Sequence, residues 1–492
     1  MSVHTSSLDA SPTAPPDADT AARNKLVISL LLVSAFVVIL NETIMGVALP
    51  HLMGDLGVTA SVAQWLTTAF LLTMAVVIPI TGFLLQRFNT RPIFMLAMST
   101  FSLGTLICAV SPGIELLIFG RIVQAIGTAI MMPLLMTTVM TLVPAETRGK
   151  TMGNISIVIS VAPAIGPTIS GLILSVLDWR WMFILVLPIA IGALILGASK
   201  IQNVTTPRKA PLDVVSVILS AIGFGSLVYG LSSLGEGASH PSPIPAWAPL
   251  ALGVVVLAVF VLRQLQLQKT DSALLDLRTL KSTTFTIAMT MMAISMMAMF
   301  GALILLPIYL QNVLGLTTLQ TGLLLLPGGL VMGLCSPFVG GLYDKHGARV
   351  LVVPGAILVS GVLWALTLVH QETPFWFLLA AHMTLSVGLA LMFTPLFTAS
   401  LGSLEPRLYS HGSAVIGTVQ QVAGAAGTAL FVALMTLQAS SQIAAGADTI
   451  AATASGVNAA FYCGALISLA GVVCSFFVRK PPNAAPGMAP AH

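Results

Sequence analysis

The sequence predicts an all-α polytopic membrane protein with fourteen transmembrane helices. Hydrophobic residues make up 57% of the 492 positions and charged residues only 7%, whereas a soluble protein carries roughly 25% charged residues. The hydrophobic residues form separate blocks, and about 20 residues suffice to cross a bilayer as a helix. Because backbone groups in lipid must bond within the protein, such blocks are expected to be helices. The ten-residue alternation that marks a transmembrane β-barrel is absent from the sequence.

Polar residues, prolines and glycines divide the chain into fourteen predicted spans. The segment 1–24 is rich in Ser, Ala, Pro and Asp and lacks the basic-then-apolar pattern of a cleaved signal, so a disordered cytoplasmic tail is expected there. Residues 481–492 have a similar composition and are expected to form a second cytoplasmic tail. The spans between the tails are 26–50, 62–85, 92–111, 113–142, 151–176, 181–199, 213–235, 247–264, 283–309, 319–342, 348–369, 374–400, 410–439 and 458–478.

The basic residues predict the orientation of these spans. If the N-terminus is cytoplasmic, 18 of the 20 Lys and Arg residues fall on the cytoplasmic side, with Arg180 outside and Arg121 within a span. This bias is typical of proteins of the cytoplasmic (inner) membrane, and it places both termini in the cytoplasm. The net charge of +4 is spread over short loops, so no nucleic-acid partner is expected.

An internal repeat divides the chain into two halves. GFLLQRFNTR at 82–91 follows the second span, GGLYDKHGAR at 340–349 follows the tenth, and the offset of 258 residues also relates Gly166 to Gly424. Two six-helix halves (25–200 and 283–480) are therefore predicted, with two helices inserted between them (201–282). Parallel repeats of this kind are typical of secondary transporters whose site lies between the halves. Three residue pairs match in the two loops, namely Gly82 with Gly340, Arg87 with Lys345, and Arg91 with Arg349.

Several motifs point to one family. RIVQAIG at 121–127 resembles a fourth-helix RxxQGxG motif with Ala125 in place of the first glycine, and GPTISG at 166–171 resembles a fifth-helix antiporter motif. WRWMF at 179–183 and LPIYLQNVLG at 306–315 resemble stretches of the same family. On these motifs the chain resembles the 14-helix drug–proton antiporter branch (EmrB/QacA type) of the major facilitator superfamily. The resemblance implies two six-helix halves plus two inserted helices, and export of drugs in exchange for protons.

Two positions depart from the family pattern. The branch has LDxTIVNVALP in its first helix, whereas this chain has LNETIMGVALP at 40–50, so that the acid is Glu42. A shift of one residue turns the acid by about 100° around the helix, and the NETxxxVALP form resembles the LmrB-like, lincomycin-efflux subgroup. In the first gating loop Gln86 stands where the family has Asp, while the second loop keeps Asp344.

Glu42 and Arg121 are the predicted proton-coupling residues. Glu42 is the only acid deep within a predicted span, and an intramembrane acid is a functional hypothesis by default. Glu42 lies eight residues before Pro50 and Arg121 eight residues after Gly113, so both lie about 12 Å below the outer surface. The alternatives are a structural, hydrogen-bonded glutamate and an arginine that braces backbone carbonyls.

Other residues are candidates for the substrate cavity or the gate. His382 occupies the repeat position of Gln124 and is either a second titrating group or a packing histidine, while the methionines of span 9 suit an apolar cavity or a lipid-facing stripe. The cavity candidates are Asn41, Gln124, Met292, Tyr309, Gln311, His382, Gln420 and Gln421. The gating candidates are Gly82, Arg87, Arg91, Gly166, Pro167, Gly171, Gly340, Asp344, Lys345 and Arg349.

The predicted function is proton-coupled efflux of amphipathic, often cationic drugs by a monomer in the lipid bilayer. The chain lacks the nucleotide-binding motif GxxxxGK[ST], which argues against an ATP-driven pump, and no cofactor is expected. One alternative is proton-coupled export of an endogenous metabolite or siderophore. A membrane-embedded receptor or enzyme is disfavoured, because the spans contain no metal-ligand cluster and no nucleophile–base pair.

Overall fold

The computed structural model describes residues 18–203, 207, 211–236, 245 and 247–478. Fourteen helices in this part of the chain are long and apolar enough to cross a membrane, as the sequence predicts. In chain order they are α1 (Ala18–Leu56), α2 (Ala60–Arg87), α3 (Thr90–Ala109), α4 (Ile114–Leu142), α5 (Arg148–Val176), α6 (Trp181–Lys200), α7 (Val214–Glu236), α8 (Trp247–Leu267), α9 (Thr283–Asn312), α10 (Thr318–His346), α11 (Arg349–Leu366), α12 (Phe375–Gly402), α13 (Tyr409–Ala444) and α14 (Thr449–Ser475).

Two helices begin earlier than the hydrophobic blocks predict. Helix α1 starts at Ala18, inside the segment expected to be a tail, and the rest of that segment and the tail 481–492 lie outside the described residues. Helix α14 starts at Thr449 instead of residue 458, because the Asp448 side chain accepts a hydrogen bond from the Ile450 amide and caps the first turn. The alanines of the turns that follow favour a helix, so the helix extends beyond its most apolar part.

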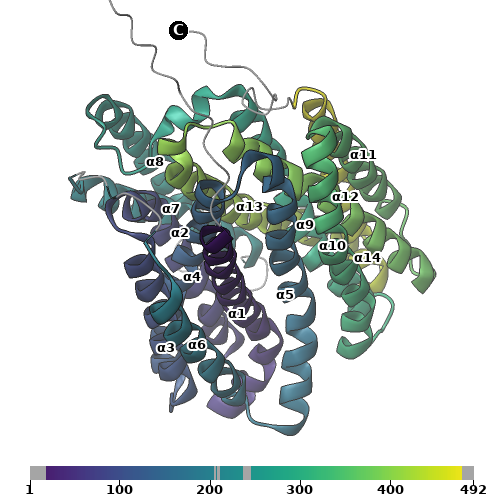
Figure 1. The fold of residues 1–492 in the computed structure, drawn as a ribbon. Coiled ribbons are helices and arrows are strands. Elements are labelled where there is room, and N and C mark those ends of the chain that lie inside the picture. Colours follow the sequence, from purple (N-terminus) through teal and green to yellow (C-terminus); the bar gives the residue numbers. More distant parts are fainter. Residues whose placement is uncertain (1–17, 204–206, 208–210, 237–244, 246, 479–492) are drawn as a thin grey trace, which may run out of the picture.

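The helices form two bundles with a hairpin at their junction. In Figure 1, α1, α2, α3, α4 and α6 lie at the left and α10, α11, α12 and α14 at the right, with α5, α9 and α13 between them. Helix α5 packs along α10 on one side of the junction, and α2 packs along α13 on the other. The inserted pair, α7 and α8, packs against itself and, through α7, against α2 and α13. We call these two contacts between the halves the α5–α10 seam and the α2–α13 seam. The inserted pair covers the α2–α13 seam.

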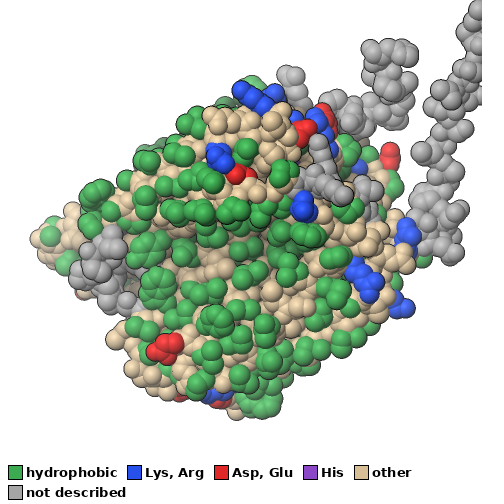
Figure 2. All heavy atoms as spheres, turned by 90° about the vertical axis from the view of Figure 1, so that its left-hand side faces the viewer, with side chains coloured by type: hydrophobic (Ala, Val, Ile, Leu, Met, Phe, Trp, Pro, Cys, Tyr) green, Lys and Arg blue, Asp and Glu red, His purple; other side chains and the backbone are tan. Residues whose placement is uncertain are grey.

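Charged residues gather at one end of the molecule. The helices alternate in direction, so that the loops after α2, α4, α8, α10 and α12 lie with the start of α1 at what we call the basic end. Among the described Lys and Arg residues, only Arg180 lies at the opposite, far end, and only Arg121 lies near the middle of a helix. In Figure 2 hydrophobic side chains cover the middle of the surface, and most Lys and Arg side chains lie toward the basic end at its top. This distribution fits a chain that crosses a membrane many times.

The two halves touch through the basic end and separate toward the far end. A stripe of small residues on α5 faces α10. In this stripe Gly149 packs against Gly340 of α10, and Ala164, further along, packs against Gly329. Gly171 continues this stripe toward the far end, yet no heavy atom of the described chain lies within 4 Å of where its Cβ would stand. Val176, five residues beyond Gly171, is 75% exposed. The structure is therefore closed at the basic end and open at the far end.

We predict that the basic end faces the cytoplasm, because positively charged loops are retained there during insertion. In a background without cysteines, Thr147→Cys at the basic end and Glu372→Cys at the far end should report the two sides, since both positions are exposed loop residues. An impermeant maleimide added to intact cells should label only Glu372→Cys. Labelling of Thr147→Cys alone would reverse the predicted orientation.

Candidate functional site

A buried arginine organises the middle of the first half. The Arg121 side chain is 1% exposed, and its Nη1 donates hydrogen bonds to Gln124 Oε1 at 2.6 Å and to Asn41 Oδ1 at 3.2 Å. Gln124 Nε2 in turn donates to Thr105 Oγ1 at 2.8 Å. The guanidinium lies 4.0 Å from the centre of the Phe70 ring, where a cation is attracted to the face of the ring. These contacts join α1, α2, α3 and α4 around one charge.

Close packing of α3 on α4 fixes the position of this arginine. Gly104 of α3 lies against the backbone of Gln124, and Gly120 and Gly127 of α4 lie against Cys108 and Phe101 of α3. A Cβ at any of these glycines would overlap its neighbour, so the two helices can approach this closely only with glycine. The Arg121 side chain is consequently held in a narrow space rather than at a lipid-facing surface.

One hydrogen-bond donor of the Arg121 side chain is left without a partner by these contacts. Within the described residues its Nε atom is buried and has no hydrogen-bond partner. A buried cation is stable only when its donors are paired, and Asn41 and Gln124 offer neutral oxygen atoms. The site therefore has the capacity to bind one more acceptor, such as a water molecule or an acidic group.

Glu42 points away from this network. Its side chain is half-buried and makes no hydrogen bond or ion pair with other described residues. Helix geometry places Glu42 midway between Asn41, which faces α4, and Thr43, which packs against Gly166 of α5. Ile44, on the opposite side of α1, is buried in the apolar cluster that α1 shares with α3 and α6. Helix geometry therefore directs the Glu42 side chain toward the space between α4 and α5.

In the structure Asn41, and not an acidic residue, makes the α1 contact with Arg121. The family pattern has an Asp at this position. Glu42 and Arg121 lie at neighbouring levels of α1 and α4, but Asn41 is interposed between them. Phe70 and Thr105 also belong to the site, but neither could be identified from the sequence because each lies in an apolar stretch of its helix. Asn41, Arg121 and Gln124 are brought together in one network, and Glu42 stands beside it.

The candidates of the second half do not form a comparable network. His382 of α12 donates a hydrogen bond from Nε2 to the Leu325 carbonyl of α10 at 3.1 Å. Gln311, Gln420 and Gln421 are half-buried on α9 and α13. Met292 and Tyr309 are fully buried in the core of the second half, and their cavity role stays a prediction. The Tyr309 hydroxyl donates to the His370 carbonyl, which holds it within the protein.

Asp344 closes the seam between α5 and α10 at the basic end. Its carboxylate accepts hydrogen bonds from the backbone amides of Gly149 at 2.7 Å and Lys150 at 2.9 Å. These amides belong to the first turn of α5, where unpaired N–H groups and the helix dipole favour a negative charge. The contact needs Gly149 and Gly340, because a Cβ on either would overlap the other helix.

The seam between α2 and α13 is closed without a charge from α2. Gln86 Nε2 donates a hydrogen bond to the Arg407 carbonyl at 2.9 Å. Arg407 and Leu408 are the repeat equivalents of Gly149 and Lys150, so Gln86 and Asp344 reach the same part of their respective partner helices. Gly82 of α2 lies against His411 of α13, as Gly340 lies against Gly149.

The remaining gating candidates lie in two groups. Gly166 and the half-buried Pro167 belong to the contact of α5 with α1, whereas Gly171 lies at the open far end. The basic gating candidates have exposed side chains at the basic end; they are Arg87, Arg91, Lys345 and Arg349.

Residues that the sequence did not suggest also join the halves. Thr137 donates a hydrogen bond to Ser413 at 3.2 Å, and Thr394 donates one to Ser156 at 2.8 Å. The described part of the chain contains no group of three or more His, Cys, Asp or Glu residues that could hold a metal ion.

Known proteins resemble this chain over most of its length. The Major Facilitator Superfamily model matches residues 31–428. The lincomycin resistance protein LmrB of Listeria monocytogenes is 40% identical over 459 residues, which cover 92% of this chain and 96% of that protein. The multidrug resistance protein B homolog of Mycobacterium tuberculosis is 30% identical over 424 residues, which cover 84% of this chain and 76% of that protein. The human organic anion transporter MFSD10 (TETRAN) has the same fold, with a TM-score of 0.65 at 14% identity over 94% of this chain and 100% of its own.

We predict that Asp344→Asn slows transport about tenfold or more, whereas Gln86→Ala has little effect. The Asp344 carboxylate accepts two hydrogen bonds from backbone amides, each worth about 1.5–3 kcal/mol because the acceptor is charged, while Gln86 makes one neutral hydrogen bond worth about 1 kcal/mol. Initial rates of dye efflux at matched expression would measure both variants. Equal losses would contradict the idea that charge at this loop controls closure.

Proposed function

Since the chain belongs to the major facilitator superfamily, we propose that it exports amphipathic, often cationic drugs across the membrane in exchange for protons. The family assignment makes the chain a transporter and not an enzyme. The relatives named lincomycin resistance protein LmrB and multidrug resistance protein B homolog support drug-like substrates. The observation that carries the proposal is the half-buried, unpaired Glu42 next to Asn41, the residue of α1 that binds the buried Arg121.

We propose that the basic end lies in the cytoplasm, with both termini, and that the protein resides in the cytoplasmic (inner) membrane. The structure then corresponds to the outward-facing state of an alternating-access cycle, because the halves touch at the basic end and separate at the far end. A single chain supplies both halves, so the transport unit in this proposal is a monomer. Rocking of the halves would break the Asp344 contact and expose Glu42 to the cytoplasm.

In the proposed cycle Glu42 binds either a proton or a substrate cation. A carboxylate in a low-dielectric site cannot remain both ionised and unpaired at low cost. It therefore attracts a cationic drug from the cytoplasmic side and takes up a proton from the outside, and the two events compete. Arg121 modulates this competition through Asn41, since a buried positive charge nearby favours the ionised carboxylate.

The proposal can be tested with purified protein in liposomes. An imposed proton gradient should drive uphill movement of a lipophilic cationic dye, and lincomycin should compete with it. If one hydrophilic metabolite alone were moved, while lipophilic cations neither bound nor inhibited, export of an endogenous metabolite or siderophore would replace drug efflux as the function.

Glu42→Gln should abolish uphill, gradient-driven efflux and retain folding and part of the drug binding. The amide keeps the size of the side chain but can no longer exchange a proton with solvent. Glu115→Gln, the same change at an exposed acid in the first turn of α4, is the matched control and should leave transport unchanged. Drug-induced proton release in a weakly buffered solution measures the coupling directly. Full drug–proton exchange by Glu42→Gln would remove Glu42 from the mechanism and make His382 the next residue to test.

A second variant pair tests the geometry around Arg121. Asn41→Asp combined with Glu42→Ala moves the acid to the residue that contacts Arg121. We expect a direct ion pair with the guanidinium, which should hold the acid ionised and lower efflux at neutral external pH at least tenfold relative to the parent protein. Arg121→Lys in this background removes the planar fork and should restore part of the activity. Unchanged coupling in the double variant would show that either face of α1 serves the site.

A further inference from the structure

At the basic end, an ion pair and a buried hydrogen bond join α7 to α8 of the inserted hairpin. Asp213, just before α7, accepts hydrogen bonds from Arg263 Nε and Nη2 of α8, both at 2.7 Å. These bonds lower the pKa of Asp213 to about 2, against the smaller opposing effect of burial, so the pair is ionised at neutral pH. Gln264, the next residue of α8, is fully buried and donates to Ser216 Oγ of α7 at 2.7 Å. Helices α7 and α8 therefore move as one unit at this end.

Gln264 also forms hydrogen bonds with the segment that follows α8. Gln264 Oε1 accepts hydrogen bonds from the backbone amides of Leu274 at 2.8 Å and Leu275 at 3.2 Å. Both leucine side chains are buried in the main core. Residues 271–278, which we call the gate loop, are thus held by α8 and by the core, although the sequence suggests only a connection between two spans.

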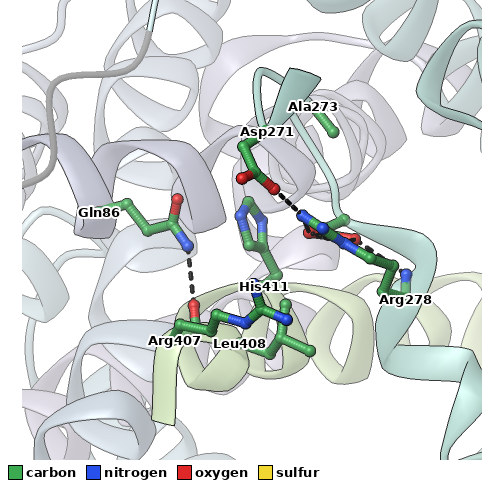
Figure 3. Close-up of a pocket in the computed structure, with 8 residues that line it drawn as sticks. Gln86, Asp271, Ala273, Arg278, Arg407, Leu408 and His411 are labelled. Carbon is green, nitrogen blue, oxygen red and sulfur yellow. Dashed lines mark hydrogen bonds and ion pairs between the residues drawn. The ribbon is translucent and has the colours of Figure 1, made fainter. Parts of the chain in front are cut away.

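The gate loop brings two acids to the seam between α2 and α13. Asp271 and Asp276 line a pocket with Gln86 of α2 and His411 of α13, and Arg278 lies between the two acids. Figure 3 shows the Asp271 carboxylate pointing toward Arg278 and the His411 ring, with Gln86 on the other side of the pocket. Arg278 is paired with both acids, by an ion pair with Asp271 and by one of 2.6 Å with Asp276. The loop therefore reaches the residues that join the two halves.

The start of α13 needs a negative charge that α2 does not provide. At the equivalent start of α5, Asp344 accepts the amide hydrogen bonds, but its repeat partner Gln86 is neutral. Two further side chains with basic groups, Arg407 and His411, lie at the α13 seam. Arg407 is exposed and pairs with the exposed Glu405 at 2.6 Å, whereas His411 is 3% exposed and inside the seam.

Asp276 is suited to supply that charge. It is 4% exposed and is held by the backbone and side chain of Arg278. Burial raises the pKa of Asp276, but the hydrogen bonds from Arg278 and the attraction of His411 bring it below the ordinary value. The carboxylate therefore stays ionised beside His411 at neutral pH.

We propose that Asp271 and Asp276 of the gate loop replace the gate acid that is missing at Gln86. In this arrangement the inserted helices and their loop form a third part of the gate, added to the two halves. Negative charge from the loop stabilises the closed basic end at the α2–α13 seam, as Asp344 does at the α5–α10 seam. The inference concerns the conformational change and is independent of the compound that is transported.

The test measures how often the basic end opens. Ser413 is 3% exposed at the seam, so Ser413→Cys in a cysteine-free, full-length protein should react with a maleimide only when this end opens. In inside-out vesicles, Asp271→Asn with Asp276→Asn should raise the labelling rate roughly two- to fivefold, the range expected for a charge near a helix terminus. Asp178→Asn is the matched control, because Asp178 pairs with Arg180 two residues later, as Asp276 pairs with Arg278, but at the far end.

Rescue distinguishes a gate acid from a loop that has merely loosened. Adding Gln86→Asp to the double variant returns an acid to the repeat position of Asp344 and should bring the labelling rate back to the parent value. An unchanged rate in the double variant, or no recovery with Gln86→Asp, would overturn the proposal. If the double variant does not fold, Asp271→Asn alone decides the question, because it leaves the contacts of Gln264 and the buried leucines intact. Faster labelling supports the gate role, and an unchanged rate refutes it.

Discussion

The structure depends on the need to keep one guanidinium in the middle of a membrane bundle. An unpaired charge at this depth costs roughly 3 kcal/mol or more, so Arg121 must find partners inside the protein. It finds them in Asn41 and Gln124 and on the face of Phe70. Four helices are thereby fixed around one side chain, and the glycines between α3 and α4 make the required approach possible. The orientation of α1, and with it the direction of Glu42, follows from this arrangement.

A second constraint acts at the basic end, where two seams must close and reopen. Both seams join the end of one helix to the start of another, which leaves unpaired amides and a partial positive charge. At α5 the charge is met by Asp344 from the other half. At α13 the neutral Gln86 meets only a carbonyl, and the acids lie in the gate loop. Two halves built from one repeat thus achieve closure in chemically different ways, and the inserted helices, which cover only the α13 seam, account for the difference.

The fold could be predicted from the sequence because its signals are large. Fourteen apolar blocks and the one-sided distribution of Lys and Arg leave little freedom in the number and direction of helices. The direction of individual side chains could not be predicted, because a membrane helix that is apolar all round has no face that marks its interior. Asn41 and Glu42 are neighbours in the chain but differ by about 100° around α1, and only packing decides which one contacts Arg121. The burial of Met292 and Tyr309 in the core could not be predicted for the same reason.

The gate loop also could not be predicted, because it is held by Gln264, a residue that is otherwise typical of a helix end.

Helix α5 connects the two constraints physically. Near its middle Gly166 lies against Thr43, the neighbour of Glu42, and at its start Gly149 and Lys150 hold Asp344. The two contacts are 17 residues apart in the sequence, which is about 25 Å along a helix. A change in the charge or the hydrogen bonds of Glu42 alters the packing of α1 on α5 at the first contact. A helix in which most backbone bonds are intact transmits such a shift as a rigid body, whereas Pro163 and Pro167 remove two backbone donors close to Gly166. The bend that these prolines permit therefore lies beside Thr43 and the proposed proton site, and the remainder of α5 reaches from there to the Asp344 contact.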